Sequence, residues 1–260
     1  MNFIEIDKKE RQGEWSMSSL QSHSYYELYF LTEGERRFFL KDKIFNISAP
    51  TVCIIPPFCM HKTEGGAYKR INVNVSEELL APQERAMLYE LGKQVVFTPE
   101  KEKWELITKL LYSGADVGSA GEDKTIAESF LHVLLYLVKK DGLLPCADEE
   151  NGEADDSSLV MQVVSYIHSH YMKPITIKSL CDKFYVSKNT LCTNFKSVIN
   201  CSVMEYLRLV RINKAKGLLM STRRSMKKIA EECGFSSANY FSLIFKEEVG
   251  ISPLNYRKSK

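Results

Sequence analysis

Two histidines and a glutamate in the first quarter of the chain have side chains that could share one metal ion or one small ligand. They are His23, Glu27 and His61. Two imidazoles and a carboxylate form a recognised iron site when other coordination positions stay open. The rival interpretation is a polar cluster in a ligand pocket. Alternate residues of a strand share one face, and an inward face lines a small-molecule pocket. The alternating residues expected in that pocket are His23, Tyr25, Glu27 and Tyr29, with His61 beside them.

A second group of candidate residues lies in a repeat near the carboxyl end. The stretch "SKNTLCTNFK" begins at Ser187, and "SSANYFSLIFK" begins at Ser236. Before the turn, Leu180 matches Ile229 at an offset of forty-nine residues, and after the turn Leu191 matches Phe241 at an offset of fifty. The second copy therefore has one extra residue between its paired helices. Each copy has a serine placed to cap a helix after a turn, which predicts two helix-turn-helix units. Two copies are too few for a helical solenoid.

The apolar residues of each second helix predict which face is free to meet DNA. At 100° per residue, the outward face lies opposite Leu191 and Phe195 in one helix and opposite Phe241 and Phe245 in the other. Asparagine is suited to a bidentate contact with adenine in the major groove, so Asn189 and Asn239 are the leading specificity residues. The residues expected at DNA bases are Lys188, Asn189, Cys192, Thr193, Ser237, Ala238, Asn239, Ser242 and Leu243.

Basic residues around these helices are expected to meet phosphates. From Leu159 onward the chain has 17 Lys or Arg against 6 Asp or Glu, whereas the preceding part has 18 against 27. Such a basic segment is the electrostatic footprint of a polyanion binder. A solvated charged surface is the alternative. The residues expected at phosphates are Lys196, Arg208, Arg211, Lys214, Lys227, Lys228 and Lys246.

The elements that carry these residues fall into four segments. Residues 1–100 contain short apolar and β-branched runs between turn signals, which predict an antiparallel sheet closed into a small barrel. Residues 101–145 have helical periodicity, and residues 146–158 form an acidic, apolar-poor linker. Residues 159–260 are predicted to be all helical. The fold class is therefore α+β and multidomain.

One predicted helix of the middle segment has an apolar face that could pack in either of two ways. Ile126, Phe130, Val133, Leu134 and Leu137 are expected to share that face, which either covers the barrel or pairs with another subunit. We predict that Phe130, Leu134 and Leu137 form a homodimer seam.

The remaining sequence features indicate where in the cell the protein is located. No apolar run is long enough for a secretory signal or a membrane span, so we expect a cytoplasmic protein that does not bind membranes. Seven cysteines lack any C-x-x-C pairing, and we expect them to be reduced thiols.

The helical segment resembles a known family. "RINKAKGLLMSTRRSMKKIAEECGFSSANYFSLIFKEEVGISPLNYR" is similar to the DNA-binding signature of AraC/XylS-type transcriptional regulators. The resemblance spans roughly residues 158–257 and implies two helix-turn-helix units, joined by a long helix, whose second helices touch bases. Family members often carry Arg where Leu243 stands; here the residue either contacts a thymine methyl or packs inward.

The first segment resembles the cupin barrel that many such regulators carry as a sensor. His23, Glu27, Gly34, Pro56 and His61 match the pattern. The sequence departs from it where Gln21 replaces the first His, where Pro50 and Phe58 replace glycines, and where Gly65 replaces Asn. Because sensor domains of this family commonly lack a metal, we expect no metal, no cofactor and no catalytic residue.

The combined expectation is a sequence-specific regulator of transcription. Its barrel senses a small-molecule effector or dimerises, its tail binds double-stranded DNA in two adjacent major grooves, and by analogy it activates RNA polymerase. The alternative is a cupin metalloenzyme fused to a nucleic-acid-binding tail. Stoichiometric metal and turnover would favour that alternative.

Overall fold

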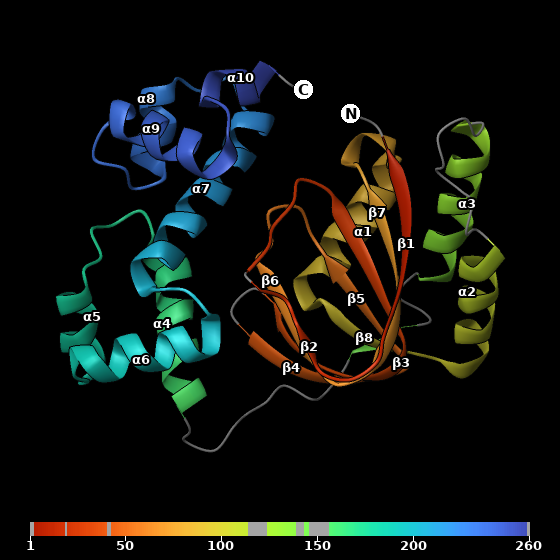
Figure 1. The fold of residues 1–260 in the computed structure, drawn as a ribbon. Coiled ribbons are helices and arrows are strands. Elements are labelled where there is room, and N and C mark those ends of the chain that lie inside the picture. Colours follow the sequence, from red (N-terminus) through yellow and green to blue (C-terminus); the bar gives the residue numbers. More distant parts are fainter. Residues whose placement is uncertain are drawn as a thin grey trace. The chain divides into compact units, whose positions relative to one another are not determined.

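The computed structural model describes residues 3–18, 20–40, 43–113, 124–138, 143–145 and 156–258 (Figure 1). The chain divides into two units, one containing most of residues 1–150 and the other containing residues 151–260. The predicted combination of an antiparallel β-sheet domain and a helical domain is confirmed.

The first unit is built on antiparallel strands in the order β1-β7-β3-β5-β8-β9, with β2, β4 and β6 joined to this path through β3 and β6. Its elements are β1 (Ile4–Arg11), β2 (Trp15–Ser16), β3 (Tyr26–Leu40), β4 (Lys43–Ser48), β5 (Thr51–Ile55), β6 (His61–Gly65), β7 (Tyr68–Val75), a 3-10 turn (Glu77–Leu79), α1 (Pro82–Gln94), β8 (Val96–Pro99), α2 (Lys101–Ser113), α3 (Lys124–Leu137) and β9 (Leu143–Pro145).

Strand β3 changes partners along its length and so curls the sheet around an interior. Residues 27–31 pair with β5, whereas residues 37–40 pair with β6. Between these stretches lies Gly34, whose φ is 88° and whose backbone approaches the Ala67 carbonyl so closely that a β-carbon would collide with it. The turn of β3 therefore requires glycine at this position.

The sheet has one apolar face and one mixed face. On β7, Ile71, Val73 and Val75 join the apolar core that α1, α2 and α3 complete. The intervening residues Asn72 and Asn74 belong to the opposite face, which looks into the interior with Glu27 and Tyr29 of β3. The helices therefore cover one face, and the other is left to form a site.

The middle helices correct the predicted homodimer seam. Phe130 and Leu134 are 8 % and 0 % exposed because α3 packs them against the sheet, whereas Ile126 and Val133 are 55 % and 50 % exposed. Leu137 is half-buried against the same core. The five predicted residues thus do not share one buried face, because the face that meets the sheet is rotated toward Leu131, Leu135 and Val138.

Two predicted boundaries also change. Residues 143–145 form strand β9 against β8, so the segment 101–145 is not helical to its end. Helix α4 begins at Asp156, inside the segment predicted to be a linker, and residues 146–155 of that linker lie outside the described residues.

The second unit contains two helix pairs joined by a long helix. Its elements are α4 (Asp156–His170), α5 (Ile177–Phe184), α6 (Lys188–Ile199), α7 (Val203–Ser221), α8 (Met226–Glu232), α9 (Ala238–Val249) and α10 (Pro253–Lys258). Phe195 of α6 packs edge-on against Tyr206 of α7, and Phe245 of α9 packs edge-on against Tyr256 of α10. Both pairs recur at the repeat offset, so the repeat preserves the aromatic contact that holds each second helix.

Candidate functional site

Helices α6 and α9 are held in equivalent ways. The Ser187 hydroxyl accepts from the Thr190 amide at 3.1 Å, and the Ser237 hydroxyl accepts from the Tyr240 amide at 3.1 Å. Each cap satisfies an amide that has no partner within its helix. Each helix ends at a residue with positive φ, Asn200 at 65° and Gly250 at 85°.

The residues predicted to contact bases lie on the solvent side of these helices. Leu191 and Phe195 are buried in the first helix, and Phe241 and Phe245 are buried in the second. Leu243 is 56 % exposed, so the interpretation that it packs inward is wrong. The exposed residues of the predicted set are Lys188, Asn189, Thr193, Ser237, Asn239 and Leu243, and the half-buried ones are Cys192, Ala238 and Ser242.

The basic residues predicted to meet phosphates fall into two groups. Arg211 donates from Nε to the Tyr171 carbonyl at 2.8 Å and from Nη2 to the Lys173 carbonyl at 2.9 Å, and Arg208 forms an ion pair with Glu248 at 3.1 Å. These two guanidiniums already tie elements of the domain together. The others are exposed lysines: Lys196, Lys214, Lys227, Lys228 and Lys246.

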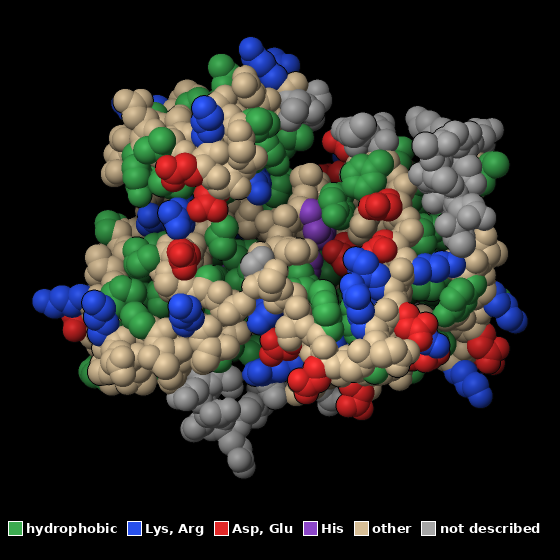
Figure 2. Space-filling model, viewed as in Figure 1, with side chains coloured by type: hydrophobic (Ala, Val, Ile, Leu, Met, Phe, Trp, Pro, Cys, Tyr) green, Lys and Arg blue, Asp and Glu red, His purple; other side chains and the backbone are tan. Residues whose placement is uncertain are grey.

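The charge of the helical unit is dispersed. On the face seen in Figure 2, Lys and Arg side chains stand at several separate places over α4 to α10. Such a distribution supplies sequence-independent attraction to a polyanion from several points.

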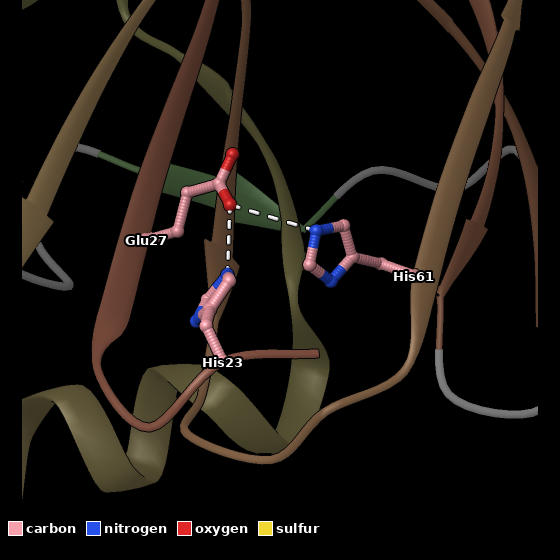
Figure 3. A group of neighbouring side chains, drawn as sticks. All are labelled: His23, Glu27 and His61. Atoms are coloured by element: carbon pink, nitrogen blue, oxygen red, sulfur yellow. Dashed lines mark hydrogen bonds and ion pairs between the residues drawn. The ribbon is translucent and has the colours of Figure 1, made fainter. Parts of the chain in front are cut away.

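His23, Glu27 and His61 meet in the interior of the first unit (Figure 3). Glu27 Oε2 lies 2.9 Å from His23 Nε2 and 3.5 Å from His61 Nε2. Glu27 and His61 are buried, and His23 is half-buried. Glu27 comes from β3, His61 opens β6, and His23 precedes β3, so the two predicted sequence motifs converge.

Backbone carbonyls fix the orientation of both imidazoles. His23 Nδ1 is 2.9 Å from the Tyr25 carbonyl, and His61 Nδ1 is 3.1 Å from the Cys59 carbonyl. Since a carbonyl oxygen can only accept, each Nδ1 must carry the hydrogen and donate it. Both Nε2 atoms consequently face the carboxylate.

The surroundings of Glu27 lower the pKa of its carboxyl group. Burial by itself would raise its pKa, but the hydrogen bond with His23 and the neighbouring charges of His61, His23 and Arg70 outweigh burial, so the pKa lies below its ordinary value. Burial lowers the pKa of His61.

The two predicted tyrosines occupy different environments. The Tyr25 ring stacks on the His23 ring with centroids 3.9 Å apart. Tyr29 is 2 % exposed, and its hydroxyl has no hydrogen-bond partner among the described residues. A buried hydroxyl without a partner is costly in an apolar surrounding, so this atom indicates where a ligand or water belongs.

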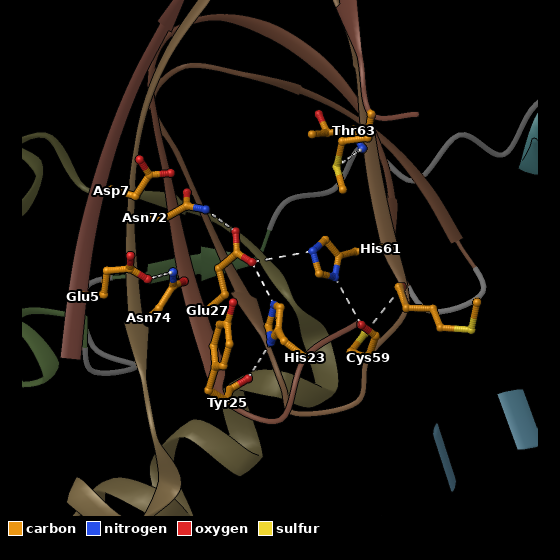
Figure 4. A network of polar contacts seen from close by, with 12 residues as sticks. Glu5, Asp7, His23, Tyr25, Glu27, Cys59, His61, Thr63, Asn72 and Asn74 are labelled. Carbon is orange, nitrogen blue, oxygen red and sulfur yellow. Dashed lines mark hydrogen bonds and ion pairs between the residues drawn. The ribbon is translucent and has the colours of Figure 1, made fainter. Parts of the chain in front are cut away.

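Sequence reasoning missed the polar residues of β7 that complete this cluster. The Asn72 amide donates to Glu27 Oε1, and the Asn74 amide donates to Glu5 at 3.1 Å (Figure 4). The carbonyl oxygens of both asparagine side chains are buried and lack partners among the described residues. The available signal was the alternation "YKRINVNV", in which polar residues occupy every second position opposite Ile71, Val73 and Val75.

Comparisons with known proteins match both units in order. Residues 8–81 match the AraC-like ligand binding domain, and residues 180–259 match a helix-turn-helix domain. An uncharacterized HTH-type transcriptional regulator of Bacillus subtilis, YfiF, is 27 % identical over 92 % of this chain and 78 % of its own length. The HTH-type transcriptional activator RhaS of Escherichia fergusonii is 25 % identical over 92 % of this chain and 87 % of its own length.

Among solved structures, the C-terminal domain of AraT, a response regulator from Geobacillus stearothermophilus, is similar to part of the chain. It is 32 % identical with a TM-score of 0.39, and the match covers 39 % of this chain and 85 % of that one. Within the part of this chain that the structure describes, every helix is too short or too polar to cross a bilayer.

The two matched domains, their order and the full-length relatives define the class as a DNA-binding transcriptional regulator with an N-terminal ligand-binding domain. The chain belongs to the AraC family.

Proposed function

We propose that α6 and α9 enter two adjacent major grooves of double-stranded DNA and read bases there. The observation that carries this proposal is that Asn189 and Asn239 occupy equivalent positions. Each is exposed, and each is the second residue after the serine that caps its helix. The two helices are also anchored in the same way. An asparagine amide matches the donor and acceptor pattern of adenine in the major groove. Cys192, Thr193, Ser242 and Leu243 supply the differences between the two sets of bases.

The exposed lysines supply the phosphate contacts in this proposal. Lys196 and Lys246 lie in the last turns of α6 and α9, and Lys227 and Lys228 lie on α8. Arg208 and Arg211 act by holding α7 in place, because their guanidiniums are already paired within the domain. Exposed lysines that do not hold elements of the domain together can contact phosphates without weakening the fold.

Selection from random DNA tests this function. Full-length chain incubated with a random library should enrich sites with two conserved blocks about 10 base pairs apart from centre to centre, since successive major grooves on one face of the duplex repeat at that spacing. Enrichment of one block alone would mean that only one helix reads bases. No enrichment would contradict sequence-specific binding.

In the first unit we propose a binding site for a small-molecule effector at His23, Tyr25, Glu27, Tyr29 and His61. Support comes from polar atoms on this interior that lack partners among the described residues, the Tyr29 hydroxyl and the side-chain carbonyls of two asparagines of β7. The effector then controls transcription, and the relative RhaS, described as an activator, favours activation of RNA polymerase. A regulator of this kind acts in the cytoplasm, where bacterial DNA lies, and needs no turnover.

We further propose that the chain forms a homodimer through the outer face of α3. Ile126, Val133 and Tyr136 are 55 %, 50 % and 74 % exposed and lie on the side of α3 away from the sheet. Burying three such side chains at a subunit interface is favourable by roughly 25 cal/mol for each Å² of apolar surface removed from water.

The variant Ile126→Ser/Val133→Ser/Tyr136→Ser should be monomeric in light scattering, with an unchanged circular dichroism spectrum. Tyr89→Ser, which changes an exposed residue of α1, is the matched control and should remain dimeric. A dimer that survives the triple substitution would place the interface elsewhere.

A further inference from the structure

The Nε2 atoms of both His23 and His61 face one carboxylate oxygen of Glu27. Each imidazole donates its Nδ1 hydrogen to a backbone carbonyl, as described above. Each Nε2 atom therefore presents a lone pair to Glu27 Oε2 unless the ring gains a second proton. A proton on one ring Nε2, or a cation bound between the three atoms, would offset the repulsion among them.

The guanidinium whose charge reaches this cluster from outside it is already paired with another carboxylate. The guanidinium of Arg70, whose charge reaches Glu27, donates to Asp7 Oδ2 at 2.8 Å and to the Asp7 carbonyl at 3.3 Å. The neighbour of the other carboxylate oxygen is the neutral amide of Asn72. An external cation would complete the cluster.

We propose that His23 Nε2, His61 Nε2 and Glu27 Oε2 bind one divalent transition-metal cation. These three atoms lie within 4.8 Å of one another, and two of the three separations are 2.9 Å and 3.5 Å. Ligand atoms on one such ion stand about 3.0–3.4 Å apart, which follows from bonds of about 2.1 Å at octahedral or tetrahedral angles.

The second layer of contacts is that of a metal site. Metal-bound histidines almost always donate their other ring nitrogen to a carbonyl or carboxylate, which orients the ring. Both histidines here do so, and Asn72 holds the second oxygen of Glu27. The pair His132 and Glu84 in the same unit has only one histidine, and that histidine is exposed.

The donor set selects the class of metal. Two neutral imidazoles and one carboxylate suit Zn²⁺, Fe²⁺ and their neighbours and disfavour Mg²⁺ and Ca²⁺, which prefer oxygen. Three protein ligands are sufficient for a site with open positions, so the replacement of the first cupin histidine by Gln21, which is exposed, does not prevent binding. The proposal departs from the expectation, drawn from the sequence, that no metal binds.

Metal content and titration of the full-length chain test the proposal directly. The chain should be prepared without a histidine tag, stripped with a chelator and titrated with Zn²⁺ in competition with a chromophoric chelator. We expect one ion per chain, and we expect Glu27→Gln and His61→Gln to bind at least about 100-fold more weakly, because even partners outside the coordination sphere contribute 10–100-fold. His132→Gln is the matched control and should bind as the parent chain does.

Two further measurements remain decisive if a variant fails to fold. The Co²⁺-loaded parent chain should show two imidazole ligands by X-ray absorption, and ¹⁵N NMR of the Zn²⁺-loaded chain should show Nε2 of His23 and His61 as the nitrogens that bind the metal. A substoichiometric metal content after titration would overturn the proposal. An X-ray absorption spectrum without imidazole ligands would overturn it too.

These outcomes do not depend on DNA or effector. A chain that binds metal but selects no DNA sequence would support the metal site and refute the proposed reading of bases. A chain that selects a DNA sequence but binds no metal would refute the metal site and support the reading of bases.

Discussion

The two helix-turn-helix units share a frame but differ at the turn and on the reading face. Tyr185 in the first turn and Gly234 in the second both have positive φ, 55° and 78°. Tyr185 is 94 % exposed, whereas a β-carbon on Gly234 would lie 2.5 Å from the Tyr171 carbonyl. The same backbone turn therefore faces solvent in one copy and packs against the end of α4 in the other.

The second turn is enclosed by neighbouring residues, whereas the first turn is exposed. Arg211 of α7 donates to the Tyr171 carbonyl and stands over the Phe235 ring at 6.0 Å. The Tyr171 carbonyl thus accepts a hydrogen bond from α7 and lies against Gly234 of the second turn. Among the described residues, nothing encloses Tyr185 in this way, so substitutions of its side chain should be tolerated.

The largest expected effect is on stability and comes from separate substitutions at the two turns. Gly234→Ala should destabilise α8 and α9 by roughly 2–4 kcal/mol, because a side chain is disfavoured at this φ and collides with the Tyr171 carbonyl. Tyr185→Gly should change stability by no more than about 0.5 kcal/mol, because relief at positive φ offsets the added freedom of the unfolded chain.

Amide hydrogen exchange of the full-length chain measures both variants, since it reports on α5–α6 and α8–α9 separately. Equal losses at the two turns would contradict the contrast between the two environments.

The next effect concerns the shared asparagines. Asn189→Ala and Asn239→Ala should each weaken binding to a selected site by about 1–3 kcal/mol, and each should relax preference in a different block. Quantitative binding to sites mutated in one block at a time separates them. Asn255→Ala, which changes an exposed residue of α10, is the control. Relaxation of the same block by both variants would break the assignment of one helix to one block.

A smaller effect is expected of the lysines. Lys196→Ala should weaken binding to all sequences alike and reduce the slope of log K against log salt by about 1, because one phosphate contact is lost. Lys246→Ala should do the same. A change in base preference without a change in salt slope would place either lysine at a base.

The sequence predicted the helical domain well because its signals are local. The serine caps and the apolar anchors at Leu191, Phe195, Phe241 and Phe245 lie within single helices, and the structure confirms both units. The role of Arg211 was not predictable in this way. It depends on the Tyr171 carbonyl, forty residues away in the chain, whose position only the packed domain defines.

The first unit was predicted less completely. On α3 two apolar stripes adjoin, and periodicity cannot tell which one meets the sheet, so Ile126 and Val133 were grouped with Phe130 and Leu134. The convergence of His23, Glu27 and His61 was anticipated from the cupin resemblance. The buried asparagines of β7 were not, although the alternation of that strand contains them.

The spacing of a selected site gives the most direct test of the central claim, that both copies read DNA from one side. Inserting five base pairs between the two blocks turns them to opposite faces, and binding by one chain should fall by roughly tenfold or more unless the DNA twists or bends. Replacing five spacer base pairs without changing length should leave affinity unchanged. Full affinity after the insertion would mean that one helix alone reads bases and that the second copy serves packing.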